Sequence, residues 1–154
     1  MNFAMAHNID AYIGAAPAAD SASLTAGGTG DNTLVTGLAI DRFAQGYPLS
    51  ASFVLRYKAV LAAAATISLA YSIETAVDSA FTAPVVLQTA ASAVVDTGAA
   101  GGSTQRGVFR IPVNLEGALQ YVRLKFTPDL SAANTDTAEV SAVAVLGGQD
   151  RLPA

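Results

Sequence analysis

The sequence predicts an all-β protein, an antiparallel β-sandwich of the jelly-roll kind with an extended N-terminal arm. Apolar and polar residues alternate over short segments, which is the pattern of strands with one buried face. Turn residues separate these segments at regular intervals, and no segment has the length and period of a helix that connects parallel strands. Roughly seven or eight strands follow from this spacing. Ig-like and jelly-roll connections both remain compatible with it.

The composition predicts one domain with an unusually uncharged surface. The chain has 154 residues, of which 52% are hydrophobic and 13% charged, about half of the ~25% typical of soluble domains. A monomer normally covers its surface with charged side chains, so this shortage favours a protein whose surface meets other protein. Small residues in loops are the alternative explanation.

Charge and cysteine content argue against several kinds of partner. The formal net charge is −4 and the basic residues are scattered along the chain, which argues against nucleic acid. There is no cysteine, so we expect no disulfide and no cysteine metal site. Residues 59–73 carry no charge but are too few to cross a bilayer, and residues 1–5 lack the pattern of a signal peptide. We expect neither a membrane nor a nucleic-acid partner.

Residues 1–32 differ from the rest of the chain and predict an N-terminal arm. Apolar side chains stand singly among Ala, Asn and Asp, and a glycine-rich run follows at residues 26–32. Such a segment cannot form its own core, so it packs loosely or lies on a neighbouring chain. A short helix at residues 4–11 is an alternative. The candidate contact residues of this arm are Phe3, Met5, Ile9, Tyr12 and Ile13.

The predicted sandwich domain covers residues 33–148, and residues 149–154 form a C-terminal tail. Alternation predicts its first strands at residues 33–41, 52–60 and 66–75, with shorter ones at 84–89 and 94–95. A turn is expected at residues 46–48, because proline interrupts a paired strand. Since alanine favours helix, a short helix at residues 61–65 is the rival interpretation of the alanine run there.

The last third of the chain predicts three further strands, at residues 107–113, 121–127 and 139–146. A turn at residues 114–119 and a polar loop at 128–137 separate them. In the middle strand Tyr121, Arg123 and Lys125 point to one side, opposite apolar residues. Together with Arg110, the two cations form either a row of positive charges suited to carboxylates on a partner or a solvated sheet face.

No set of residues predicts a reaction, so we expect no enzyme, no cofactor and no metal. His7 is the only histidine and has no catalytic partner near it in the sequence, and no Gly-x-Ser-x-Gly motif is present. Asp129, Asp136 and Glu139 do not have the spacing of a calcium loop. The glycines before Asp31 lack the lysine and the helix of a phosphate loop.

The strand Gln120-Tyr121-Val122-Arg123-Leu124-Lys125-Phe126-Thr127 is followed by a polar loop and a last small-apolar strand at residues 138–146. An earlier strand with a Ser/Asp-containing hairpin, at residues 68–81, precedes them. With the N-terminal arm, this series resembles tailed-bacteriophage capsid cement, or decoration, proteins. The resemblance covers residues 50–148 and rests on a pattern of strands.

The resemblance implies a non-enzymatic virion protein that binds the outer surface of a capsid and cements neighbouring subunits. The implied partners are the major capsid protein and the protein itself, as a homodimer or homotrimer. The protein would be made in the host cytoplasm and end on the capsid surface. A tail, neck or baseplate component is one alternative. A carbohydrate-binding sandwich is another, although the chain has no tryptophan and only outward tyrosines such as Tyr121 would serve it.

Overall fold

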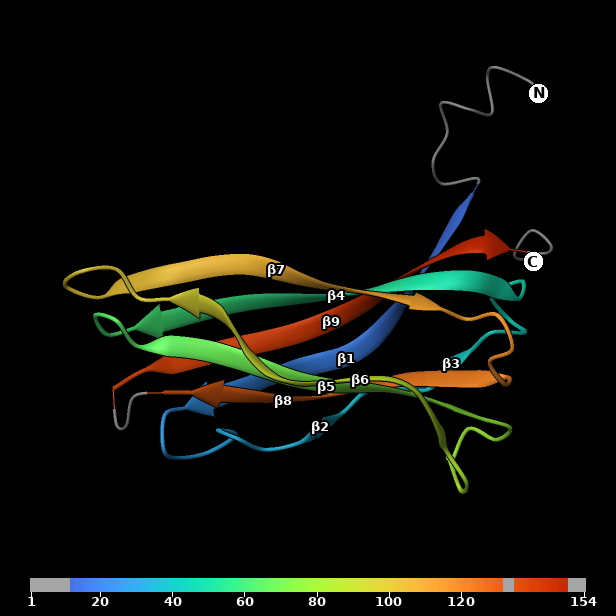
Figure 1. The fold of residues 1–154 in the computed structure, drawn as a ribbon, viewed down its shortest axis with the longest axis horizontal. Coiled ribbons are helices and arrows are strands. Elements are labelled where there is room, and N and C mark those ends of the chain that lie inside the picture. Colours follow the sequence, from blue (N-terminus) through green and yellow to red (C-terminus); the bar gives the residue numbers. More distant parts are fainter. Residues whose placement is uncertain (1–11, 132–134, 150–154) are drawn as a thin grey trace, which may run out of the picture.

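The computed structural model describes residues 12–131 and 135–149, and within these ranges all regular structure is β-strand (Figure 1). The strands are β1 (Ile13–Thr25), β2 (Val35–Thr36), β3 (Ile40–Asp41), β4 (Pro48–Leu61), β5 (Thr66–Ala76), β6 (Val85–Thr97), β7 (Ser103–Asn114), β8 (Tyr121–Leu130) and β9 (Thr137–Gln149). The described ranges contain no helix with the length and apolarity of a membrane crossing.

The strands form two antiparallel sheets. Sheet A has the order β1-β9-β4-β7, and sheet B has the order β2-β8-β5-β6, with β3 also paired to β8. Taking β2 and β3 as one interrupted strand, the chain changes sheet at every connection except the β5–β6 hairpin. This strand order is that of an eight-stranded jelly roll. The predicted fold class is therefore confirmed, and the connections are jelly-roll rather than Ig-like.

The core lies between the two sheets and follows the predicted alternation. Phe53 and Leu55 of β4 and Leu124 and Phe126 of β8 are fully buried, and the intervening residues of both strands are more exposed. Each buried side chain of this size contributes about 1.5–3 kcal/mol relative to an exposed one. The two facing sheets are thus held together mainly by apolar burial.

The boundary predicted at residue 32 is wrong, because the sandwich already includes Ile13–Thr25. This segment is β1, which pairs with β9 along its length and buries Ala18 and Leu24. Two register shifts, between Pro17/Ala19 and Ala19/Ala22, break the period-2 pattern, and small residues weaken it further. Phe3, Met5, Ile9, His7 and the alternative helix at residues 4–11 lie outside the described residues, as do residues 150–154 of the predicted tail.

The strand predicted at residues 33–41 is interrupted at Gly37. The Gly37 N–H donates to the carbonyl of Leu124 in sheet B, and the next N–H, of Leu38, donates to the carbonyl of Ala18 in sheet A, each at 2.8 Å. A Cβ at Gly37 would collide with both carbonyls. The segment therefore bridges the two sheets at this edge instead of forming a continuous strand, and only glycine fits the crossing.

Two other local predictions differ from the structure. The alanine run is the turn between β4 and β5 rather than a helix, with Ala64 at a φ of 61° and its N–H bonded to the carbonyl of Gly98. Residues 85–89 and 94–95 are parts of one long strand, β6, which begins one residue after the predicted start at residue 84. Three register shifts relative to β5 disturb the alternation of β6, so that the sequence shows two short pieces where the backbone forms one strand.

Candidate functional site

The carboxylates predicted around the last loop serve separate structural roles. The buried Asp136 accepts a hydrogen bond from the Ala62 N–H at 2.9 Å, and Glu139 accepts one from the Ser21 hydroxyl at 2.6 Å. Ser68 donates to Asp129 at 3.3 Å. Within the described ranges no three His, Cys, Asp or Glu residues gather as metal ligands would.

The glycine-rich turn after β1 is closed by its own carboxylate. Asp31 accepts hydrogen bonds from the Gly27 N–H at 2.7 Å and from the Leu130 N–H at 2.8 Å. A phosphate in such a turn would use the same backbone donor. The turn is therefore occupied by a side chain of the protein, and Asp31 ties it to the end of β8.

The outer face of sheet B, the side turned away from sheet A, carries a buried ion-pair cluster. Glu74 of β5 accepts hydrogen bonds from Arg123 at 2.8 and 2.9 Å and from Lys125 at 3.1 Å. Phe81, from the β5–β6 loop, covers this cluster with its ring centroid 4.1 Å from the Arg123 guanidinium. Burial alone would raise the pKa of Glu74, but the hydrogen bonds and positive charges of Arg123 and Lys125 lower it below its ordinary value.

Three of the predicted contact residues lie on this face. Tyr121, Arg123 and Lys125 are consecutive outward residues of β8, as predicted, and all are partly buried. Arg123 and Lys125 are engaged by Glu74 of the same chain. The prediction that Arg110 shares their face is wrong, because Arg110 belongs to β7 of the other sheet.

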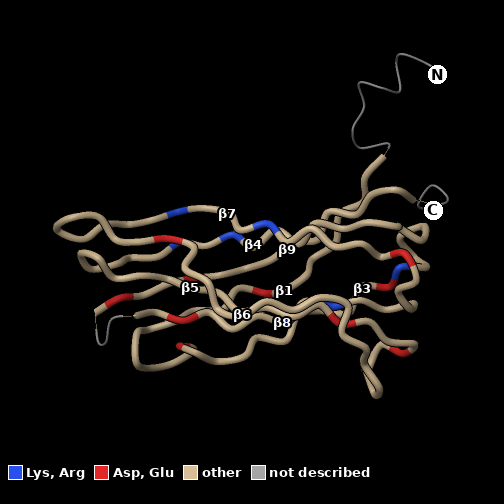
Figure 2. Tube along the Cα trace, in the orientation of Figure 1, with Lys and Arg blue, Asp and Glu red and all other residues tan. Residues whose placement is uncertain are grey.

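The outer face of sheet A, the side turned away from sheet B, holds a different set of charges. Four exposed cations lie on two neighbouring strands, Arg56 and Lys58 on β4 and Arg106 and Arg110 on β7. Figure 2 shows these positive positions along β4 and β7. We call them the basic strip. In the described part of the chain none of the four makes an ion pair or a hydrogen bond, whereas Arg42, Arg123 and Lys125 all do.

The outer face of sheet A is divided by charge. On the β4–β7 half, the residues that alternate with the buried ones include the basic strip and no acid. On the β1–β9 half they include Glu139 and no cation. The register brings Lys58 of β4 opposite Glu139 of β9 and opposite Arg106 of β7.

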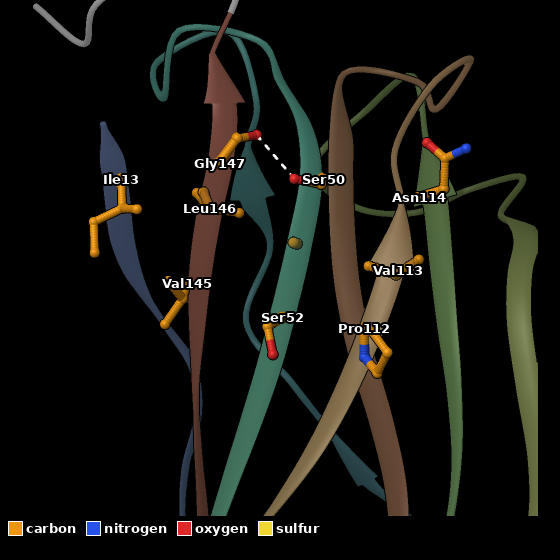
Figure 3. A pocket seen from close by; sticks show the side chains of 10 residues that line it. Ile13, Ser50, Ser52, Pro112, Val113, Asn114, Val145, Leu146 and Gly147 are labelled. Carbon is orange, nitrogen blue, oxygen red and sulfur yellow. Dashed lines mark hydrogen bonds between the residues drawn. The ribbon is translucent and has the colours of Figure 1, made fainter. Parts of the chain in front are cut away.

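A shallow groove crosses the same face near the start of β1. It has a volume of about 550 Å³ and is open to solvent (Figure 3). Its floor is low because Ser50, Ser52 and Gly147 are small, and the Ser50 hydroxyl donates to the Gly147 carbonyl at 3.2 Å. Ile13 and Pro112 stand at its two sides. Its lining residues, from β1, β9, β4 and β7, are Ile13, Ser50, Ala51, Ser52, Pro112, Val113, Asn114, Val145, Leu146 and Gly147.

Apolar side chains occupy much of the remaining outer face of sheet A. Val143 of β9 is 49% exposed, Val108 of β7 56% and Val60 of β4 45%. A solvated sheet face usually presents polar residues outward, so exposed valines on three neighbouring strands favour a surface that another chain covers. With the groove and the basic strip, they make this face the candidate functional site.

The sequence contained a signal for this site that alternation alone could not resolve. Arg56 and Lys58 alternate with buried residues of one strand, and Arg106 and Arg110 share the parity of another. The two strands are neighbours only through the jelly-roll order of sheet A. Of the predicted contact residues, Ile13 lies in the groove, and Tyr12 is exposed beside it.

No family model matches the chain, and no curated protein matches it. Similar solved structures include the Gx strain of infectious bursal disease virus, at 15% identity and a TM-score of 0.47 over 92% of this chain and 34% of that chain. The VP2 subviral particle of infectious bursal disease virus is similar at 14% identity and a TM-score of 0.47, over 92% of this chain and 34% of that chain. The T13 viral particle of that virus is similar at 14% identity and a TM-score of 0.49, over 92% of this chain and 32% of that chain. The chain thus spans about a third of the length of each, and such identities carry no residue role or activity to it.

Proposed function

We propose that the protein is a non-enzymatic structural component of a virion that binds the outer surface of a phage capsid and cements neighbouring capsid subunits. The observation that carries this proposal is the uncovered outer face of sheet A. It combines exposed valines, a shallow groove and cations that have no ionic partner among the described residues, all on one four-stranded sheet. Jelly rolls serve as capsid domains, but also as lectins and cupins, so the fold alone does not decide the function.

The groove is better suited to a protein surface than to a small ligand. Its lining contains no aromatic, histidine or carboxylate side chain. Sugar-binding sites commonly present an aromatic ring to the sugar, and catalytic sites require groups that transfer protons or attack. Ligand pockets also enclose most of their ligand, whereas this groove is open along one side. The carbohydrate-binding alternative therefore has less support than a structural role.

The proposed contact with the major capsid protein includes the start of β1. Tyr12 is 46% exposed and Ile13 lines the groove, so the described part of the chain begins beside this face. Phe3, Met5 and Ile9 supply the apolar anchors that the sequence places in this segment. An arm of this kind adds contact area to each copy, and many copies on one shell multiply a weak contact.

The test is binding of the purified full-length chain to capsid shells of the virus that encodes it. We expect the protein to sediment with the shells and to add density to their outer surface in electron microscopy. A full-length variant with Phe3→Ser and Ile9→Ser should bind less while keeping its β-sheet circular dichroism spectrum. Absence of binding would contradict the proposal, and density on the tail or neck would favour the alternative role.

A further inference from the structure

We propose that a second copy of this chain docks on the outer face of sheet A, in a symmetric dimer whose twofold axis runs parallel to the strands between β9 and β4. Self-association through this face goes beyond the proposed capsid role, and a capsid shell would compete with the second copy for the same surface. The occupant follows from the charge division of the face. The cations lie on the β4–β7 half and the acid Glu139 on the β1–β9 half, so a second copy can be turned to bring each Lys58 to a Glu139.

The orientation of the axis follows from electrostatics. A twofold axis parallel to the strands places β4 of one copy against β9 of the other and β7 against β1, because the strand order is β1-β9-β4-β7. The basic strip then meets a half that carries Glu139 and the hydroxyls of Ser21, Ser23 and Ser141, all of which can accept hydrogen bonds. A twofold axis in the plane of the sheet but perpendicular to the strands would instead place β4 of one copy against β4 of the other, and β7 against β7. Two basic strips would then face each other, and like-charge contacts oppose association.

The register along the strands identifies the individual contacts. Rotation about an axis parallel to the strands leaves each residue at its own height along the sheet. Lys58 and Glu139 are directly opposite each other within one copy, so they stand at one height. In the dimer, Lys58 of each copy therefore faces Glu139 of the other. Val54 and Val143 also share a height, so Val54 of each copy meets Val143 of the other copy.

The size of the face is sufficient for a stable dimer. Four strands spaced ~4.8 Å apart, along about eleven residues of ~3.3 Å each, cover about 700 Å² on each copy. This is close to the ~800 Å² per partner of a standard protein–protein interface. Two flat sheets that meet face to face pack with their strands nearly aligned. Val54 and Val143 lie on the two inner strands beside the axis, and Arg106 and Arg110 lie on the edge strand β7, where such interfaces have a polar rim.

The test uses two charge-reversal variants of the full chain, Lys58→Glu and Glu139→Lys, in sedimentation equilibrium. We expect the wild-type chain to be a dimer at micromolar concentration. Each variant alone places like charges opposite each other twice per dimer and should weaken association at least about tenfold. An equimolar mixture restores opposite charges at both contacts, so a heterodimer of near wild-type affinity should form. Native mass spectrometry with one variant isotopically labelled identifies that heterodimer.

The matched control is Glu116→Lys, which makes the same change at an exposed acid in the β7–β8 turn. It should leave dimerisation unchanged. Circular dichroism and urea denaturation of each variant establish that the domain is folded. A wild-type chain that remains monomeric even at about 100 µM would overturn the proposed dimer. A mixture of the two variants that does not recover association would overturn it as well. A monomer that still binds shells would leave the capsid role standing, so the two proposals fail separately.

Discussion

Two strands of this jelly roll carry the same Arg-x-Lys pattern and use it in opposite ways. On β8, Arg123 and Lys125 are bound by Glu74 and partly covered. On β4, Arg56 and Lys58 are exposed and have no ionic partner in the described part of the chain. The residue between the cations differs as well, since Leu124 on β8 is apolar, whereas Tyr57 on β4 donates a hydrogen bond to Asp96 at 2.9 Å.

The two sheets use the few charged residues of this protein for different purposes. On the outer face of sheet B, Arg123 and Lys125 pair with the buried carboxylate of Glu74, which would be costly to leave unpaired. The outer face of sheet A leaves its cations available for another molecule. Substitutions in the ion-pair cluster of sheet B should therefore change folding, and substitutions in the basic strip of sheet A should change association.

The substitution Glu74→Gln should destabilise the protein most. It leaves Arg123 and Lys125 side by side without a counter-charge, and we expect the free energy of unfolding to fall by about 2–3 kcal/mol, reduced from a fully buried pair by partial solvent access. Glu139→Gln, the matched change on sheet A, should alter stability by no more than about 0.5 kcal/mol. Urea denaturation of the three proteins measures both. Equal losses would remove the distinction between the faces.

The next effect is that of Phe81→Ala. Phe81 is 5% exposed and its ring covers the Arg123 guanidinium. Its removal exposes the ion-pair cluster and should lower stability by about 2 kcal/mol, from lost apolar burial and a lost cation–π contact. The pairing of Glu74 should also become more sensitive to salt, because solvent then screens it. A variant as stable as the wild type in low and high salt would show that the ring is not a functional cover.

A smaller effect concerns pH and the link between the sheets. Burial, the hydrogen bond to Asp96 and the charge of Asp96 raise the pKa of Tyr57 to about 12 from its ordinary value of 10.0. The neutral phenol is thus favoured in the folded state. Its contribution is fully present below pH 10 and is lost as the pH rises through 12. Tyr57→Phe should cost about 1 kcal/mol at neutral pH and reduce this alkaline loss. Thermal denaturation against pH, compared with the wild type, measures both.

The contribution of Glu74 to stability changes with pH in the opposite direction, because it is lost at low pH. Its pKa is lowered in the folded state, so its contribution is present above the unfolded value of 4.5 and is lost as the pH falls through the folded value. Glu74→Gln should therefore show less acid destabilisation than the wild type in urea denaturation below pH 4.5. If the variant and the wild type lost the same stability between neutral and acid pH, the proposed role of the cluster would be contradicted.

The smallest effect on stability is expected for Arg56→Ala combined with Arg106→Ala. Both side chains are exposed and make no ion pair in the described residues, so stability should change by less than about 0.5 kcal/mol. Self-association should weaken, because the basic strip loses half of its charges. Chemical denaturation of samples dilute enough to be monomeric and light scattering of concentrated samples separate the two quantities. A large loss of stability would show that these cations are used internally after all.

The fold was predictable from sequence wherever alternation was regular. The strands around Phe53 and Phe126 follow it closely, and the sandwich class is confirmed. β1 was missed because bulges and alanines hide its pattern, and Gly37 ended a predicted strand because two carbonyls approach it. The candidate site was predicted only in part. Whether Arg123 or Arg56 is free depends on where Glu74 lies in space, and strand periodicity carries no such information.

The proposed dimer covers the outer face of sheet A, whereas the exposed valines of sheet B, among them Val86 and Val94 of β6, take no part in it. Hydroxyl-radical footprinting of the wild-type chain, in dilute and in concentrated solution, tests it most directly. We predict that Val54, Val108 and Val143 become protected as concentration rises, while Phe81 and Tyr121 keep their reactivity. Protection of Tyr121 without protection of Val143, or no protection at any concentration, would contradict the account.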